Sequence, residues 1–370
     1  MKGLYWKSSQ RKVLYFIILA ILSLFGSYLV EHFKIQKLQD NYSEKMEAAS
    51  LASKAFQSIR SEKIRLHRKI DPIADPTGSG LIGEFFTPVT SNLGNLRAKQ
   101  TSINPNFAAL VFDYLVRAGV KKGDKVAVSL SGSFPALNIA VYSAAQVLDI
   151  DLVIISSFTS SQWGANDPEF LWPDMERVLI NQKVLKYASS VYTWGGVEDQ
   201  AFGIQEEGFN SLKAAASKRS FPILKSKNYE ESFEERIKLY SFRLPISEYK
   251  AYINVGGGTV SVGTKKSSSD FSPGLNLKHP IRSGGRDSVM KRFARVGVPV
   301  IHIVRIEELA RENGFTLTPN KLPNIGEGKI FQRQEYNLWL SGSVLFGILF
   351  LLYLFFKRDS FIEEDRDESI

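Results

Sequence analysis

Residues 125–156 read KVAVSLSGSFPALNIAVYSAAQVLDIDLVIIS, and the pattern of this stretch indicates the fold class. Its two ends, KVAVSL and DLVIIS, are short apolar runs that are typical of buried strands. Between them, Pro135 begins an Ala-rich segment, and proline is favoured at the first position of a helix. A strand, a helix and a second strand in this order predict part of a mostly parallel sheet that is covered by helices.

The alternation of helix and strand continues on both sides of this stretch. Asn104 and Pro105 open a predicted helix that runs to about Arg117. Further helices are predicted from Pro173 and near 206–218 and 228–241, and further strands over 192–194, 251–255 and 298–304. We therefore expect an α/β domain over residues 105–330, with a mostly parallel, Rossmann-like sheet.

Residues 32–70 carry apolar side chains at three- and four-residue steps, with charged side chains on the other face. This period predicts one long helix that ends before Pro72, because a residue before proline avoids helical geometry. We interpret residues 31–71 as a helical stalk that continues a membrane helix and lies on the globular domain. A self-associating coiled coil is the alternative. Residues 72–104 are too apolar for a free linker, and we expect an ordered strap packed along the domain.

Two long apolar segments flank the central part of the chain. VLYFIILAILSLFGSYLV covers residues 13–30 and LWLSGSVLFGILFLLYLFF covers residues 338–356, and neither contains a charged residue. At about 1.5 Å per residue, helices of this length approach the ~30 Å hydrocarbon core of a bilayer. We expect two transmembrane helices, the first an uncleaved anchor, because no small-x-small cleavage site precedes Glu31.

Basic residues mark one side of both predicted spans. The first span follows Lys2, Lys7, Arg11 and Lys12, and the second is followed directly by Lys357 and Arg358. The positive-inside rule then places residues 1–12 and the acidic tail 357–370 in the cytoplasm. Residues 31–337 are expected outside it, so the predicted location is the bacterial cytoplasmic (inner) membrane, crossed twice.

The charge and the composition restrict the kind of partner. The chain has 47 basic and 38 acidic residues, a net charge of +9, and residues 31–337 hold 40 and 32 of them, a net of +8. A basic surface favours an anionic partner, and the expected location argues against nucleic acid. Because there is no cysteine, the chain has no disulfide, thiolate metal site or cysteine nucleophile. The four histidines show no metal-binding spacing, and we expect no metal and no cofactor.

The turn after the first strand of the opening stretch is the first candidate site. Ser131, Gly132 and Ser133 form this turn, and Asn138 follows in the helix. Free backbone N–H groups and the helix dipole attract anions at such a turn, and ligands of open α/β sheets bind at the carboxyl ends of strands. The alternative is a tight turn that Ser133 caps.

Two further loops follow predicted strands. The strand at 251–255 is followed by Gly256, Gly257, Gly258 and Thr259, which suit a small-anion site or a close-packed bend. Ser157 begins the polar loop after the strand DLVIIS, where function tends to be located. In and after this loop, Trp163 and Trp172 offer either an aromatic wall or ordinary packing.

A glycine turn near the end of the domain supplies two candidate cations. Arg282 and Arg286 flank this turn and suit the clamping of a carboxylate, with solvated surface arginines as the alternative. The signals for catalysis are poor, because His302 lies inside the apolar run VIHIV and is expected in the core. We expect a binding subunit. The alternative is a hydrolase or transferase that acts through Ser131 or Ser133 with His302 and an acid.

Four blocks of sequence carry a resemblance to a known family. They read GLIGEFFTPVTSNLGNLRAKQTSINPNFAALVFDYLVRAGV, GDKVAVSLSGSFPALNIAVYSAAQ, SSQWGANDPEFLWPDME and NVGGG. Over roughly residues 78–305, with the terminal anchors in similar places, the chain resembles the poly-γ-glutamate system protein family. Members of this family are membrane proteins that accompany the ligase and membrane subunits making poly-γ-glutamate capsules or secreted polymer.

The resemblance implies a role in poly-γ-glutamate synthesis or export, and it supplies no catalytic residues. The partners it implies are the membrane subunits of the synthase and the poly-γ-glutamate chain, with the lipid bilayer around the anchors. A polymer of carboxylates needs cationic side chains and helix-terminal N–H groups outside the membrane, and the sequence offers both. We therefore expect a two-pass accessory subunit whose outer domain binds the polymer or organises the synthase. A hydrolase or transferase acting on the γ-glutamyl polymer is the alternative.

Overall fold

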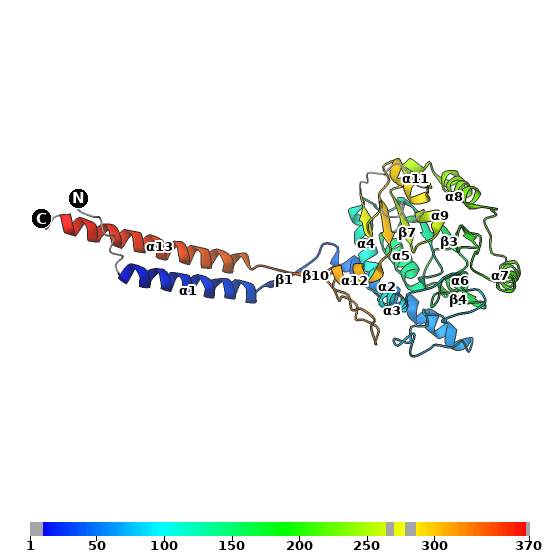
Figure 1. Ribbon diagram of the computed structural model, residues 1–370, viewed down its shortest axis with the longest axis horizontal. Coiled ribbons are helices and arrows are strands. Elements are labelled where there is room, and N and C mark those ends of the chain that lie inside the picture. Colours follow the sequence, from blue (N-terminus) through cyan, green and yellow to red (C-terminus); the bar gives the residue numbers. More distant parts are fainter. Residues whose placement is uncertain (1–9, 264–269, 278–285, 368–370) are drawn as a thin grey trace, which may run out of the picture. The chain divides into compact units, whose positions relative to one another are not determined.

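The computed structural model describes residues 10–263, 270–277 and 286–367 (Figure 1). The chain divides into two compact units. One unit runs from Asp40 to Phe331 and contains the sheet, and the other is made of the two segments that flank it.

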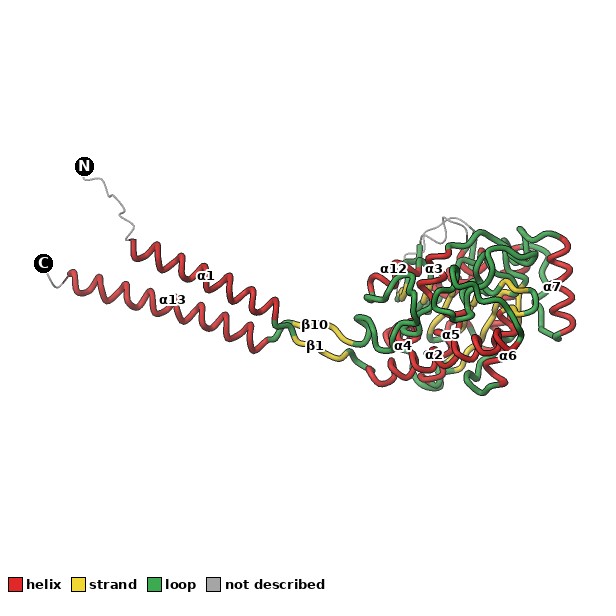
Figure 2. Tube along the Cα trace, turned by 90° about the horizontal axis from the view of Figure 1, so that it is seen from below, coloured by secondary structure: helices red, strands yellow, loops and turns green. Residues whose placement is uncertain are grey.

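The flanking unit consists of two long helices and a two-stranded ribbon. Its elements are α1 (Gln10–His32), β1 (Ile35–Leu38), β10 (Gln332–Glu335) and α13 (Leu338–Asp367). The strands pair antiparallel, and the helices lie side by side in Figures 1 and 2. Gly26 of α1 leaves room for the Val344 side chain of α13. Among the described residues, two helices are long and apolar enough to cross a membrane, over Val13–His32 and Leu338–Lys357. These spans contain both predicted segments.

The continuous helix expected over residues 32–70 is wrong. α1 ends at His32, β1 follows, and the next helix, α2 (Tyr42–Arg65), begins only after Asn41 in a left-handed conformation. The apolar stripe of α2 is buried in the compact unit, where it packs against three other helices. The stripe that suggested a stalk is therefore the inner face of a core helix, and the compact unit begins at Asp40 rather than at residue 105.

The sheet confirms the α/β prediction. Within the described residues, six strands stand in the order β6-β3-β2-β7-β9-β8, and every neighbouring pair is parallel except β8 with β9. The strands are β2 (Lys125–Leu130), β3 (Asp151–Ser157), β6 (Val191–Thr193), β7 (Ala251–Val255), β8 (Gly274–Asn276) and β9 (Val300–Ile303). The chain adds β3 and β6 on one side of β2 and then β7 and β9 on the other, so the direction of winding reverses between β2 and β7.

Alternate residues of each central strand face opposite layers of helices. In β2, Val126 and Val128 belong to one apolar cluster and Ala127 to another. Side chains from α4 (Phe107–Arg117), α5 (Pro135–Leu148), α6 (Trp172–Asn181) and α12 (Ile306–Glu312) complete the first cluster. Side chains from α8 (Tyr229–Arg243), α9 (Thr259–Val262) and α11 (Val289–Arg295) complete the second.

Helix α5 is buried almost all round because it lies between two layers. Its first eleven residues are all buried, since the sheet covers one side and α2 packs on another. Four alanines of α2 are fully buried, and small side chains allow two helices to approach closely: Ala48, Ala49, Ala52 and Ala55. The remaining elements are α3 (Leu96–Ser102), β4 (Asn166–Asp167), β5 (Phe170–Leu171), α7 (Glu206–Lys218) and the short 3-10 helix η1 (Ile246–Glu248).

Candidate functional site

The carboxyl ends of the parallel strands surround a polar pocket of about 240 Å³. It opens between the loops that follow β2 and β7, where the strand order reverses. In open α/β sheets such a reversal leaves a crevice in which ligands bind. Side-chain hydroxyl groups dominate the lining, and they belong to Ser91, Ser129, Ser131, Ser133, Ser157, Thr159, Ser161, Thr259 and Ser261.

Of the four residues predicted in and after the β2 loop, two line the pocket and two support the loop without lining the pocket. Ser131 and Ser133 line the pocket, and the backbone N–H of Ser133 donates to Ser131 Oγ at 3.1 Å. Asn138 is fully buried and donates to the Ser131 carbonyl at 2.9 Å, so it holds the loop rather than facing the pocket. Gly132 donates to Ser157 Oγ at 3.1 Å, which joins this loop to the end of β3.

The loop after β7 presents backbone donors. Gly257, Gly258 and Thr259 line the pocket, whereas Gly256 turns the chain at φ +86° and accepts a bond from Asn254 at 2.6 Å. Within the described residues, the N–H groups of Gly257 and Gly258 have no acceptor. A side-chain Cβ at either glycine would have nothing within 4 Å, so both positions face open space. These two N–H groups are available to an anionic or carbonyl-bearing ligand.

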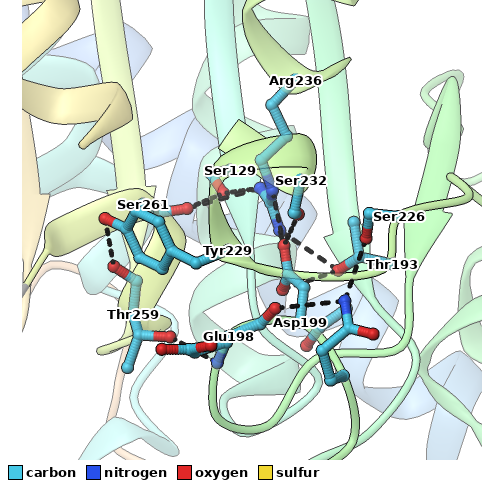
Figure 3. Close-up of polar contacts among 12 residues, drawn as sticks. Ser129, Thr193, Glu198, Asp199, Ser226, Tyr229, Ser232, Arg236, Thr259 and Ser261 are labelled. Carbon is cyan, nitrogen blue, oxygen red and sulfur yellow. Dashed lines mark hydrogen bonds and ion pairs between the residues drawn. The ribbon is translucent and has the colours of Figure 1, made fainter. Parts of the chain in front are cut away.

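A buried ion pair lines the floor of the pocket, and no local sequence pattern predicted it. Arg236 on α8 donates from Nε to Asp199 Oδ2 at 2.8 Å, and both side chains line the pocket (Figure 3). The same guanidinium donates to Ser129 Oγ at 3.1 Å and to Thr193 Oγ1 at 3.1 Å, at the ends of β2 and β6. The Asp199 carboxylate also accepts from Ser232 at 2.7 Å. The pair is neutral as a unit, and it fixes the strand ends around the pocket.

A buried lysine lies behind the wall that the β2 and β3 loops share. Lys99 on α3 is 3% exposed, and its ammonium donates to the Ser133 carbonyl and, at 2.9 Å, to Ser161 Oγ. It also lies 4.0 Å from the centre of the Phe134 ring. No carboxylate forms an ion pair with it among the described residues, and burial lowers the pKa of Lys99 to about 7.

No family model, curated protein or solved structure matches this chain. The chemistry of the pocket therefore follows from its own residues. Among those that the structure describes, no group of three or more His, Asp or Glu side chains is placed to hold a metal ion. Hydroxyl and backbone N–H groups of the lining are available to a ligand as donors.

Two predicted arginines do not reach the pocket. Arg286 is 40% exposed and pairs with Glu198 at 2.5 Å and Glu230 at 2.8 Å on the outer surface. Arg286 is therefore a surface arginine, which was the alternative interpretation of this residue. Arg282 lies outside the described residues.

The serine and histidine of the proposed triad do not meet. His302 is buried in β9, where its Nδ1 lies 3.2 Å from the Asn254 side-chain amide. Burial, assisted by the nearby Arg305, lowers the pKa of His302 to about 4. In the described part of the chain, the hydrogen-bond partner of each serine Oγ is a backbone N–H, from Ser133 to Ser131 Oγ and from Ser161 to Ser133 Oγ. Neither Oγ contacts a basic side chain there.

The two tryptophans near the polar loop pack elsewhere. Trp172 is fully buried against Tyr142, and Trp163 contacts Phe85 at a ring distance of 5.2 Å. Neither lines the pocket, so ordinary packing accounts for both.

Proposed function

We propose that this chain is a membrane-anchored binding subunit, without chemistry of its own, of poly-γ-glutamate synthesis or export. Its α/β domain would hold one carboxylate-bearing unit of the polymer in the pocket between the β2 and β7 loops. The observation that carries this proposal is the set of donors around that pocket, where serine and threonine hydroxyls meet the unpaired N–H groups of Gly257 and Gly258. Hydrogen bonds from such groups to a charged acceptor are stronger than neutral ones.

The size and charge of the pocket favour a small anionic group. A volume of about 240 Å³ is below the roughly 300–1,000 Å³ of sites for drug-sized ligands, so it suits one unit or a chain end. Asp199 and Arg236 compensate each other, which leaves the Lys99 ammonium as the uncompensated charge near the lining. A γ-glutamyl unit offers a free carboxylate and amide groups, which match these donors.

The polymer itself is inferred from the sequence resemblance and from the predicted topology. Two apolar helices support a membrane anchor, and the basic residues beside them favour both termini in the cytoplasm of a bacterial cell. The domain would then face outward, with a Rossmann-like fold that the order of its parallel strands supports. Its partners would be the polymer and the membrane subunits of the synthase.

Calorimetry on the full-length protein in detergent tests the binding role. We expect γ-linked glutamate oligomers to bind and α-linked oligomers of equal charge to bind more weakly, at salt concentrations that screen loose surface contacts. Gly258→Leu places a side chain at the open position in the lining and should abolish binding. Ser50→Leu on the exposed side of α2 is the matched control. Equal binding by all three proteins would contradict the proposal.

Two further measurements test the location and the absence of catalysis. Reporter fusions at residues 1, 200 and 370 should give a cytoplasmic signal at both ends and an external one at 200. Incubation of the protein with poly-γ-glutamate should leave the chain length unchanged. A cytoplasmic signal at residue 200 would remove the extracellular polymer as a ligand, and shortened chains would favour the hydrolase alternative. Co-purification with synthase membrane subunits tests the partnership.

A further inference from the structure

Lys99 differs from two paired buried cations of the compact unit, Lys45 and Arg236. Lys45 lies 2.9 Å from Asp113, and Arg236 lies 2.7 Å from Asp199, so each of these charges is compensated. The Lys99 ammonium instead contacts a carbonyl, a hydroxyl and an aromatic ring, and no carboxylate pairs with it in the described ranges. A buried charge without a partner is costly, and a ligand can supply what the protein lacks.

Ser161 connects this charge to the pocket. Its Oγ accepts from Lys99 at 2.9 Å, and its backbone N–H donates to Ser133 Oγ at 3.0 Å, which fixes its position. Ser161 lines the pocket, and its own hydroxyl hydrogen has no acceptor among the residues that the structure describes. A hydroxyl that accepts a bond from an ammonium is a stronger donor, because chained hydrogen bonds polarise one another.

Thr159 supplies a second unused donor to the same pocket. It is 2% exposed and lines the pocket, yet its Oγ1 has no hydrogen-bond partner in the described part of the chain. A Cβ at Gly195, another lining residue, would lie 2.6 Å from this oxygen, so the glycine makes the room for it. Buried hydroxyls nearly always have a partner, so an unpartnered one beside a pocket is available to an atom of a bound ligand.

We propose that Lys99, Ser161 and Thr159 form a subsite for one carboxylate group, in which the ammonium compensates the charge and the two hydroxyls donate to its oxygens. This assignment rests on the proposed function, since it places a ligand in the same pocket. A carboxylate fits better than a phosphate, because one lysine balances one negative charge. A dianion would leave the second charge buried and unpaired.

The subsite couples binding to a proton. Burial lowers the pKa of Lys99 to about 7, so the empty protein holds this lysine largely neutral at pH 8 and above. A carboxylate beside it favours the charged form, and binding above pH 7 then takes up one proton. Lys99 lies behind the lining, and the ionisable side chains of the described lining are Asp199 and Arg236, which pair with each other. The affinity should therefore fall about tenfold for each pH unit above 7.

The test is calorimetry of γ-glutamylglutamate with full-length protein in detergent, from pH 6 to pH 9, in buffers that differ in ionisation enthalpy. The wild-type protein should take up close to one proton at pH 8 and almost none at pH 6. Lys99→Met should weaken binding at pH 6 by tenfold or more and remove the pH dependence. Thr159→Val and Ser161→Ala should each weaken it by about five- to a hundredfold.

Ser143 provides the matched control for Thr159. Its hydroxyl is also fully buried without a partner, but it lies in α5 and does not line the pocket. Ser143→Ala should leave the affinity unchanged, and thermal unfolding should show both this variant and Thr159→Val to be folded. The pH profile and Thr159→Val keep the test valid if Lys99→Met does not fold.

The outcomes separate the subsite from the proposed function. Binding that is independent of pH and of Thr159 overturns the subsite while the binding role stands. Phosphate that binds more tightly than the dipeptide, with the same dependence on Lys99, overturns the carboxylate assignment. No binding of the dipeptide by the wild-type protein at any pH overturns the subsite and the binding role together.

Discussion

Arg236 Nη2 lies 2.7 Å from Asp199 Oδ2, and both side chains are buried at the floor of the pocket. The pair joins the loop after β6 to helix α8, and its further bonds reach Ser129 at the end of β2 and Ser261 in α9. It therefore ties together the strand ends and helices that form the floor. A residue pair at such a junction controls the shape of the site as well as the stability of the fold.

Asp199→Asn should destabilise the protein strongly. The substitution leaves the guanidinium of Arg236 buried without a counter-charge, which costs about 3–5 kcal/mol in comparable buried pairs. Chemical unfolding followed by tryptophan fluorescence measures the change. Arg286→Gln removes two exposed ion pairs, with Glu198 and Glu230, and should cost less than about 1 kcal/mol. Equal losses of stability for the two variants would show that the buried pair contributes no more to stability than the exposed pairs.

The stability of the empty protein should rise between pH 7 and about pH 10. Burial lowers the pKa of Lys99 from 10.5 to about 7, so in this range the unfolded chain binds a proton that the folded chain has released. Stability increases with pH wherever the unfolded state binds more protons, so the cost of burying the charge is full below pH 7 and is relieved above it. Unfolding midpoints across this range should rise for the wild-type protein and stay flatter for Lys99→Met. If the midpoints of the two proteins rose equally with pH, the proton released on folding would belong to a group other than Lys99.

Gly132→Ala should distort the pocket and destabilise the protein, whereas Gly257→Ala should leave the stability unchanged. A Cβ at position 132 would lie 2.8 Å from the backbone oxygen of Thr159, so the loops after β2 and β3 must separate to admit it. Overpacking of this kind costs about 1–3 kcal/mol, and the shift should also weaken ligand binding. At position 257 a Cβ has nothing within 4 Å. Thermal unfolding and calorimetry of the two variants measure both effects, and an unaffected Gly132→Ala would contradict this account of the loop.

The sheet and most of its helices were predictable because local signals agreed with the tertiary structure. Pro135 begins α5, and the apolar runs at 125–130 and 151–156 match β2 and β3. The short antiparallel strand β8 was missed, since Gly274–Asn276 has no strand signal of its own and is paired by β9. The prediction of a stalk was wrong because an amphipathic stripe shows that one side of a helix is covered, but does not show which element covers it.

The candidate site was predictable where it follows the ends of strands. Ser131, Ser133 and Ser157 could be named from the sequence, because the carboxyl ends of parallel strands meet at one edge. Lys99, Asp199 and Arg236 were missed, since each lies in a helix or loop whose position depends on tertiary packing. The local sequence around a buried charged residue does not differ from that around an exposed one, so no local pattern distinguishes Arg236 from Arg286.

Ala52→Leu should show whether α2 is a core element of the domain. Ala52 is fully buried, and α2 packs against α4, α5 and α6, so three additional carbon atoms have no space unless the helices separate. Overpacking in a well-packed interface costs about 1–3 kcal/mol, which thermal unfolding of the full-length protein will detect. Ser50→Leu adds a leucine to the exposed side of the same helix and should change the stability by less than about 0.5 kcal/mol. A stalk resting loosely on the domain would tolerate both substitutions equally. Selective damage by Ala52→Leu requires instead that the helix following the anchor folds together with the sheet, and that α5 is fixed in place by it.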